Sequence, residues 1–154
     1  MFYKIRRQDR ALAEAEAEKI LAAAPYGILS LVGENGYPYG VPVNAAWQDG
    51  KLYFHCAAEG RKLDAIAHCE KACFTAVLAA EVRPEEFTTY YQSAVAFGKI
   101  RLLSSPDEKR AAMEVLLRRF APGLETEGLK RLEAAMGQVV LAEMAVEQLT
   151  GKKH

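Results

Sequence analysis

Residues 26–56 read YGILSLVGENGYPYGVPVNAAWQDGKLYFHC, and this stretch decides the fold. It opens with an apolar run, and the turn formers Gly33-Glu34-Asn35-Gly36 follow at once. Apolar runs joined by a short glycine-containing turn are typical of β-hairpins. β-branched and aromatic residues resume over 37–47, and a second turn at 48–51 leads to an alternating strand over 52–56. The stretch therefore predicts three consecutive antiparallel strands.

Further helix and strand signals occur on both sides of this stretch. Strong helix formers fill residues 11–24 until Pro25 ends the helix. Ser105 and Pro106 are typical of a helix start, which predicts a helix that runs to about Phe120. The remaining predictions are short helices over 61–68 and 129–136 and strands over 72–78, 90–103 and 139–149. Six or so antiparallel strands with helices inserted between them indicate a mainly β, α+β fold built on a small barrel.

Composition limits the class of protein and of partner. At 154 residues the chain has the length of one domain, so residues 1–154 are expected to form a single domain. A content of 51% hydrophobic and 26% charged residues excludes a disordered chain. The 20 Lys and Arg residues balance 20 Asp and Glu residues, so no overall positive charge draws the protein to nucleic acid or anionic lipid. A bound anion must therefore be held by a local cluster of cations.

The sequence carries no clear membrane or secretion signal. No apolar stretch approaches the ~20 residues that cross a bilayer, which predicts a protein that does not span a membrane. Acidic residues stand where a signal peptide has its apolar segment, and the three cysteines form no CxxC spacing. Reduced thiols and a cytoplasmic location are therefore expected.

The segment AAEGRKLD at residues 57–64 places two adjacent cations at a predicted helix start. A helix start exposes N–H groups without intrahelical partners and a partial positive charge, and Arg61 and Lys62 add two full charges. This combination fits a phosphate group. The alternative is that both cations belong to an ordinary solvated first turn, and the spacing by itself does not separate the two interpretations.

The neighbouring pairs His55-Cys56 and His68-Cys69 raise the question of a metal site. Residues 55 and 56 point to opposite faces of a strand, and residues 68 and 69 lie at a helix end, so neither pair can chelate as CxxC or HxxxH does. No metal site is expected, and Cys56 is expected to pack in the core. His55 is either a hydrogen-bonded core histidine or part of a pocket. Because GxGxxG and GxxxxGK[ST] are both absent, Rossmann and P-loop nucleotide sites are excluded.

Several segments together resemble the pyridoxamine 5′-phosphate oxidase-like FMN-binding split barrels, most closely their nitroimidazole-resistance (NimA-type) branch. Their order and spacing carry the resemblance, which covers nearly the whole chain. The segments are IRRQDR at 5–10, YGILS at 26–30, GYPYGVPVN at 36–44, LYFHC at 52–56, EGRKLD at 59–64 and YQSAVAFGK at 91–99. The resemblance implies a six-stranded antiparallel split β-barrel of the FMN-binding type.

In that family the flavin lies in a groove at a two-fold dimer seam, which implies a homodimer with FMN at the subunit seam and a small-molecule substrate. The resemblance implies that His55 borders the substrate space, which makes it the candidate catalytic residue. The implied cofactor contacts are Pro42, Val43 and Asn44 beside the isoalloxazine, His55 and Cys56 at the ribityl and phosphate end, Arg61 and Lys62 on the phosphate, and Ser93 as a polar flavin contact.

The resemblance implies an FMN-dependent oxidoreductase whose substrates are nitroaromatic or similar electron-poor compounds. The oxidases' substrate-phosphate residues have no match in VEQLTG at 146–151, which argues against vitamin B6 oxidation. A non-catalytic carrier of flavin or haem is the alternative, because no acid or base in the sequence is forced into a catalytic role. A dimer without any cofactor would leave Arg61 and Lys62 unexplained.

Overall fold

A computed structural model of the chain describes residues 2, 4–135 and 137–154. Its strands are β1 Ala11–Leu12, β2 Gly27–Val32, β3 Pro38–Val43, β4 Ala46–Gln48, β5 Lys51–Ala57, β6 Lys71–Arg83, β7 Thr88–Leu102 and β8 Val139–Lys153. Its helices are α1 Glu14–Ala23, α2 Arg61–His68, α3 Pro106–Phe120 and α4 Glu125–Ala134, with single 3-10 turns at Gln8–Arg10 and Pro84–Glu86. Within the described residues, no helix combines the length and the apolar character that a bilayer crossing requires.

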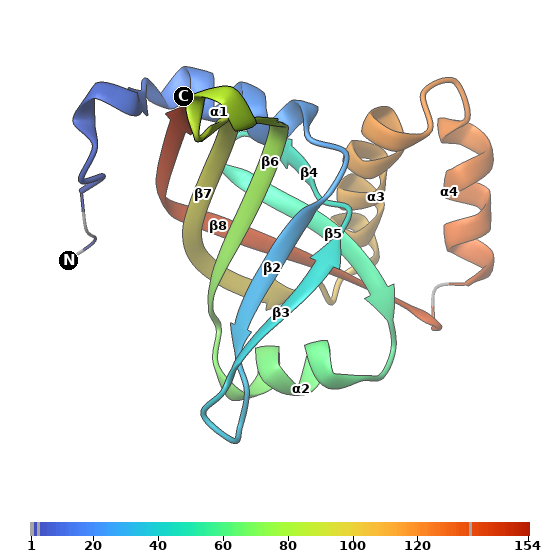
Figure 1. The fold of residues 1–154 in the computed structure, drawn as a ribbon. Helices are drawn as coiled ribbons and strands as arrows, with labels where there is room; N and C mark the ends of the chain where they lie inside the picture. Colours follow the sequence, from blue (N-terminus) through green and yellow to red (C-terminus); the bar gives the residue numbers. More distant parts are fainter. Residues whose placement is uncertain (1, 3, 136) are drawn as a thin grey trace.

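The strands found in the described residues form one antiparallel sheet. The strand order is β3-β2-β6-β7-β8-β5-β4, and the short β1 pairs with the far end of β8. Figure 1 shows the sheet curving into a barrel. β3 and β4 are the edge strands of this sheet in the described part of the chain, and β4 pairs only with residues 51–53 of β5. The barrel is therefore split between β3 and residues 54–57 of β5.

The prediction of three consecutive antiparallel strands over residues 26–56 is wrong in one respect. β2 and β3 form the predicted hairpin and β4 and β5 form a second one, but β3 and β4 lie at opposite ends of the strand order. The chain leaves β3 at Asn44, whose Nδ2 donates a hydrogen bond of 2.7 Å to the carbonyl of Pro25. Ala45 is buried in the core immediately afterwards. This local break in the strand creates the split.

Two other differences from the sequence predictions lengthen the sheet. The helix predicted over 11–24 begins only at Glu14, because residues 11–12 pair with residues 151–152 as β1 and β8. The same pairing carries β8 through the basic residues up to Lys153, which were expected to follow the strand. With the short β1 and β4, the described residues hold eight strands rather than six, while the mainly β split-barrel class is as predicted.

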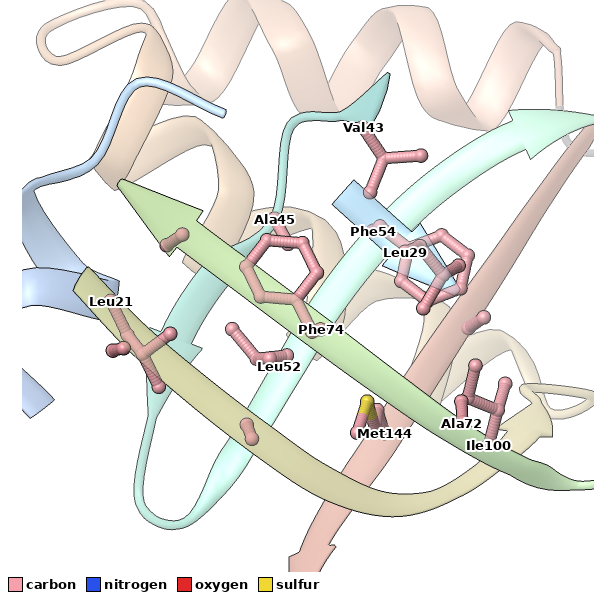
Figure 2. Close-up of a cluster of buried hydrophobic side chains, with 14 of the residues drawn as sticks. Leu21, Leu29, Val43, Ala45, Leu52, Phe54, Ala72, Phe74, Ile100 and Met144 are labelled. Carbon is pink, nitrogen blue, oxygen red and sulfur yellow. The ribbon is translucent and has the colours of Figure 1, made fainter. Parts of the chain in front are cut away.

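Large apolar side chains from both sides of the split fill the barrel. Phe54 of β5, Leu29 of β2 and Val43 of β3 belong to one buried cluster, which α1 closes at one end through Leu21. Figure 2 shows these side chains in one close-up with Phe74 of β6. Full burial of one such side chain contributes about 1.5–3 kcal/mol. Core packing therefore holds β3 and β5 in position although no hydrogen-bonded ladder joins them.

A second apolar cluster lies on the outer face of the sheet, where α3 covers β5 and β8. Leu141 of β8 is completely buried there against Leu116 of α3, and Tyr53 of β5 packs at its edge. The start of α3 is as predicted, since the backbone N–H of Glu108 donates to the Oγ of Ser105 at 3.2 Å. The sheet is thus covered on its outer face over β5 and β8.

One buried carboxylate connects the strands under α3. Glu143 of β8 is buried, and its carboxylate accepts hydrogen bonds from Lys51 Nζ at 3.2 Å and from Arg101 Nε at 2.8 Å. Arg101 also forms an ion pair of 2.8 Å with Glu108 in the first turn of α3. These contacts tie β5, β7 and β8 to the helix.

Candidate functional site

The two strands that border the split carry most of the site residues expected from the sequence. Pro42 and Asn44 lie exposed at the end of β3 and just beyond it. Val43 lies between them with its side chain buried in the core, so it can meet a ligand only through its backbone. His55 and Cys56 lie near the end of β5, with the first exposed and the second half-buried.

A cavity of about 260 Å³ opens beside the split where Asn44 and His55 meet α3. The His55 side chain is exposed and makes no hydrogen bond with the part of the chain that the structure describes. Of the two interpretations of His55, the structure therefore supports a pocket residue over a hydrogen-bonded core histidine. The other lining residues all come from α3 or its end: Met113, Leu116, Leu117, Phe120 and Ala121.

This apolar wall of α3 is the part of the site that the sequence analysis missed. Met113, Leu117 and Phe120 recur at helical spacing, so they share one face of the helix. The spacing is visible in the sequence and could have indicated a second apolar face. Which part of the sheet this face covers depends on contacts far apart in sequence, and no local pattern indicates it.

Two arginines near the end of α3 hold this wall in place. Arg118 donates to the side-chain oxygen of Gln48 in β4 at 3.0 Å. Arg119 donates to the carbonyl of Ala23, at the end of α1, at 2.7 Å. A cation is stabilised at the C-terminal end of a helix by the helix dipole. Contacts from two other elements thus fix the helix that lines the His55 cavity.

A second cluster lies where β5 leads into α2. Gly60 precedes the helix with φ +128°, a backbone conformation that residues with side chains rarely adopt. The N–H of Leu63 is the first to bond back, to the carbonyl of Gly60 at 2.9 Å. The N–H groups of Arg61 and Lys62 therefore have no intrahelical partner. Within the described residues, neither of these cationic side chains forms an ion pair.

The two cations at this helix start face different surroundings. Lys62 is half-buried, and its Nζ lies 5.9 Å from the centroid of the Phe54 ring. Burial raises the pKa of the Cys56 thiol, and the positive charge of Lys62 acts in the opposite direction. Arg61 is exposed and lines a different cavity, against the turn between β2 and β3. Lys62 therefore lies on the Phe54 side of the helix start and Arg61 on the side of β3.

Ser93 lies apart from the other expected site residues. It sits on β7 opposite Val77 of β6 and Lys152 of β8, so β2 and β6 separate it from β3. The structure brings Asn44 together with His55 but places Ser93 with neither. No three His, Cys, Asp or Glu side chains gather as a metal site within residues 2, 4–135 and 137–154.

Sequence comparison gives a match over almost the entire chain. Residues 13–153 match the family described as pyridoxamine 5′-phosphate oxidase. A search of curated proteins gave no significant match.

Several solved structures share the fold at low sequence identity. A candidate 5-nitroimidazole antibiotic resistance protein from Bacteroides thetaiotaomicron is 22% identical, with a TM-score of 0.77 over 93% of this chain and 86% of that one. A flavocytochrome from Azotobacter vinelandii is 19% identical, with a TM-score of 0.80 over 99% of this chain and 72% of that one. An FAD-binding protein from Mesorhizobium loti is 22% identical, with a TM-score of 0.68 over 94% of this chain and 97% of that one.

Proposed function

Because the chain belongs to the pyridoxamine 5′-phosphate oxidase family, we propose that it is an oxidoreductase that binds the FMN moiety of a flavin along the split between β3 and β5. The observation that carries the proposal is the cation pair at the start of α2, which no carboxylate of the described residues neutralises. A flavocytochrome and an FAD-binding protein with the same fold support a flavin as the cofactor. The FMN moiety is common to FMN and FAD.

The start of α2 fits a phosphate by its chemistry. The unpartnered N–H groups of Arg61 and Lys62 are donors, and the two side chains carry full positive charge. Hydrogen bonds between charged groups are about twice as strong as neutral ones. The Nζ of Lys62 in particular lies 5.9 Å from the centroid of the Phe54 ring in β5, so its ammonium group is placed to meet a phosphate at this end of the split.

The opposite end of the split fits a ring with a polar edge. Asn44 uses its Nδ2 to hold the carbonyl of Pro25, which fixes the side chain and leaves its Oδ1 as an acceptor. The backbone of Val43 lies at the same edge, because its side chain is anchored in the core. When bound there, a flavin would supply hydride or electron transfer. The residues of the chain bind and orient the reactants.

The cavity beside His55 fits a small, flat, largely apolar substrate. Its volume of about 260 Å³ and its α3 wall favour a single aromatic ring, and the imidazole of His55 can donate or accept one hydrogen bond. Nitroaromatic or similar electron-poor compounds combine these properties. We therefore propose such compounds as substrates, with His55 as the residue that contacts them.

The outer face of β2, β6 and β7 favours a homodimer. Ile28, Val77 and Phe97 lie on this face at 38%, 50% and 38% exposure, with the Phe2 ring 5.7 Å from that of Phe97. Apolar side chains gathered on one face are typical of an interface between subunits. Ser93 lies on the same face, so in a two-fold dimer it would serve a flavin bound mainly by the partner subunit.

A carrier of flavin or haem is the second candidate function. The observation that favours it is that no side chain of the described residues orients the His55 imidazole, whereas general acids and bases are usually held by a second group. Stopped-flow reduction of the flavin-loaded protein followed by reoxidation with a nitroaromatic compound separates the two. Rapid reoxidation supports the enzyme, and reoxidation at the rate of free flavin supports the carrier.

The cysteines are consistent with a cytoplasmic location, which we include in the proposal. Cys56, Cys69 and Cys73 are all free thiols in the structure. Free thiols persist in reducing compartments, whereas secreted proteins tend to oxidise theirs.

The binding of FMN and of riboflavin tests the proposed cofactor site. Lys62→Ala should weaken FMN binding roughly tenfold to a hundredfold, because one charge-assisted contact to a phosphate is lost. Riboflavin lacks the phosphate, so its affinity should change little. Lys130→Ala, an exposed lysine in α4, is the matched control and should leave both affinities unchanged. Equal loss of FMN and riboflavin affinity, or no loss of either, would contradict the phosphate role.

A further inference from the structure

A cavity of about 360 Å³ lies on the β3 side of α2, outside the proposed FMN site. Its walls come from three elements: the turn between β2 and β3, the start of β3, and the first two turns of α2. The lining residues are Gly33, Glu34, Asn35, Tyr37, Pro38, Tyr39, Arg61, Asp64 and Ala65.

Arg61 joins this cavity to the phosphate end of the FMN site. Successive residues of an α-helix point about 100° apart, so Arg61 and Lys62 serve two sides of the same helix start. Lys62 lies toward Phe54, with its Nζ 5.9 Å from the ring centroid, whereas Arg61 lies in the wall of the cavity. A diphosphate that spans the helix start could therefore meet one cation at each phosphate. A ligand longer than FMN would leave the FMN site at this cavity.

Two tyrosines give the cavity the surfaces that a purine requires. Tyr37 and Tyr39 both line it, and Tyr39 is half-buried against the barrel core. Tyr37 is 73% exposed, which is high for a large aromatic ring. Nucleobases stack on aromatic side chains. Gly36 makes the turn tight with φ +77°, and the N–H of Gly33 donates to the carbonyl of Tyr37 at 3.0 Å. Tyr37 thus stands at the end of a hairpin turn that this backbone hydrogen bond closes.

The polar groups of the cavity indicate which end of a nucleotide enters it. Asp64 and Glu34 are carboxylates without an ion pair among the described residues, and each can accept hydrogen bonds. Asn35 uses its Oδ1 to accept from the backbone N–H of Tyr37 at 3.1 Å, which leaves its amide N–H groups as donors. Carboxylates repel further phosphates but accept from ribose hydroxyls and from an adenine amino group. The uncharged nucleoside end therefore fits inside, with the diphosphate at Arg61.

We propose that this cavity is an adenosine subsite, so that the chain binds FAD in preference to FMN. The inference rests on the proposed function, because the FMN moiety must first occupy the split. Arg61 then holds the second phosphate, Tyr37 and Tyr39 stack with the adenine, and Asp64 and Glu34 accept hydrogen bonds from the ribose or the base.

Titration of the whole chain with FAD, FMN and riboflavin tests the subsite. FAD should bind the wild-type protein about tenfold or more tighter than FMN, and Tyr37→Ala should remove about tenfold of the FAD affinity while FMN affinity stays unchanged. Arg61→Ala should likewise weaken FAD more than FMN. Tyr26→Ala is the matched control, since Tyr26 is 57% exposed but lies outside the cavity.

Three results separate this inference from the proposed function. Equal affinity for FAD and FMN in the wild-type protein overturns the adenosine subsite alone. A Tyr37→Ala variant that loses FMN and FAD affinity equally also overturns it, because the tyrosine would then only maintain the fold of the hairpin. Failure of every flavin to bind overturns both the subsite and the proposed function.

Discussion

The outer face of the sheet has two regions that differ in how far the rest of the chain covers their apolar side chains. Over β5 and β8 the chain covers its own apolar surface with α3, and Leu141 is completely buried there. Over β2, β6 and β7 the outward-facing residues include Ile28, Val77 and Phe97, and Val77 remains 50% exposed. Both regions belong to one continuous sheet whose inner face forms the core.

The flavin site that we propose lies along the border between the two regions. An antiparallel sheet that is apolar on both faces needs cover on both. One region receives it from α3, whose edge also forms the wall of the His55 cavity. In the other region the ring of Phe2 lies 5.7 Å from that of Phe97, but Ile28 and Val77 stay partly exposed, and a second copy of the chain would cover them. The split between β3 and β5 opens beside this border.

Apolar side chains beneath α3, over β5 and β8, should contribute far more to the free energy of unfolding than exposed apolar side chains elsewhere. Leu141→Ala removes a completely buried side chain beneath α3, so the free energy of unfolding should fall by about 2–5 kcal/mol. Leu124→Ala, at an exposed leucine before α4, is the control and should change it by less than about 1 kcal/mol. Urea unfolding followed by circular dichroism measures both. Similar losses in the two variants would mean that α3 packs only loosely on the sheet.

A charge introduced on the outer face of β2, β6 and β7 should weaken dimer association but leave the folding of each chain nearly unchanged. Val77→Lys places a charge at the proposed seam twice, once from each subunit, so the dimer dissociation constant should rise about a hundredfold or more. The thermal unfolding of the monomer should change little, because Val77 is half exposed. Leu124→Lys is the matched control for an added lysine at an exposed apolar site. Sedimentation equilibrium that shows both variants dimerising like the wild type would move the seam elsewhere.

A change at His55 tests the proposed site at the border between the two regions. It should affect the rate of reoxidation more than the affinity for FMN. His55→Ala should weaken FMN binding by no more than about 1 kcal/mol, the value of one hydrogen bond. Reoxidation of the reduced protein by a nitroaromatic compound should slow clearly, because the side chain lines the proposed substrate cavity. Flavin fluorescence and stopped-flow absorbance measure the two effects. A variant purified without flavin would instead identify His55 as a cofactor anchor.

The smallest expected effect concerns the ion pair that ties the covered region to α3. The hydrogen bond and charge of Arg101 lower the pKa of Glu108 in the folded protein. A lowered folded pKa stabilises the protein above the unfolded pKa of the carboxyl, and this contribution is lost as pH falls through the folded pKa. Glu108→Gln should therefore lose a little stability at neutral pH and show a flatter decline in acid.

Thermal unfolding from neutral to acidic pH measures this difference. Glu34→Gln removes an exposed carboxylate that has no ion pair among the described residues, so it is the control. A Glu108→Gln curve parallel to that of the wild type would show that the ion pair with Arg101 adds nothing.

Local signals made part of this architecture predictable from the sequence. The turn at 33–36 and the cap at Ser105 are set by a few adjacent residues, and both elements form as predicted. The family resemblance was also confirmed, since residues 13–153 match the model of the pyridoxamine 5′-phosphate oxidase family. The break at Asn44 was not predictable, because its cause is a hydrogen bond to Pro25, 19 residues earlier.

In the candidate site, too, contacts between residues far apart in sequence could not be predicted. Arg61 and Lys62 could be identified from their position at a helix start, and His55 from its place on a strand face. The partners of His55 in its cavity come from α3, more than 50 residues later, and no local pattern joins them. The different surroundings of Arg61 and Lys62 likewise depend on the hairpin turn that packs against α2. Sequence patterns thus identify candidate groups, and tertiary structure decides which of them meet.

Sedimentation velocity of the flavin-loaded protein, recorded in both the protein band and the visible flavin band, tests the central claim most directly. The claim is that a flavin occupies the split at the border of a seam between two chains. The flavin absorbance should sediment with a particle of twice the 17.0 kDa chain mass, at about one flavin per chain. Flavin that sediments with a 17.0 kDa particle, or a protein that binds none when flavin is added, would contradict it.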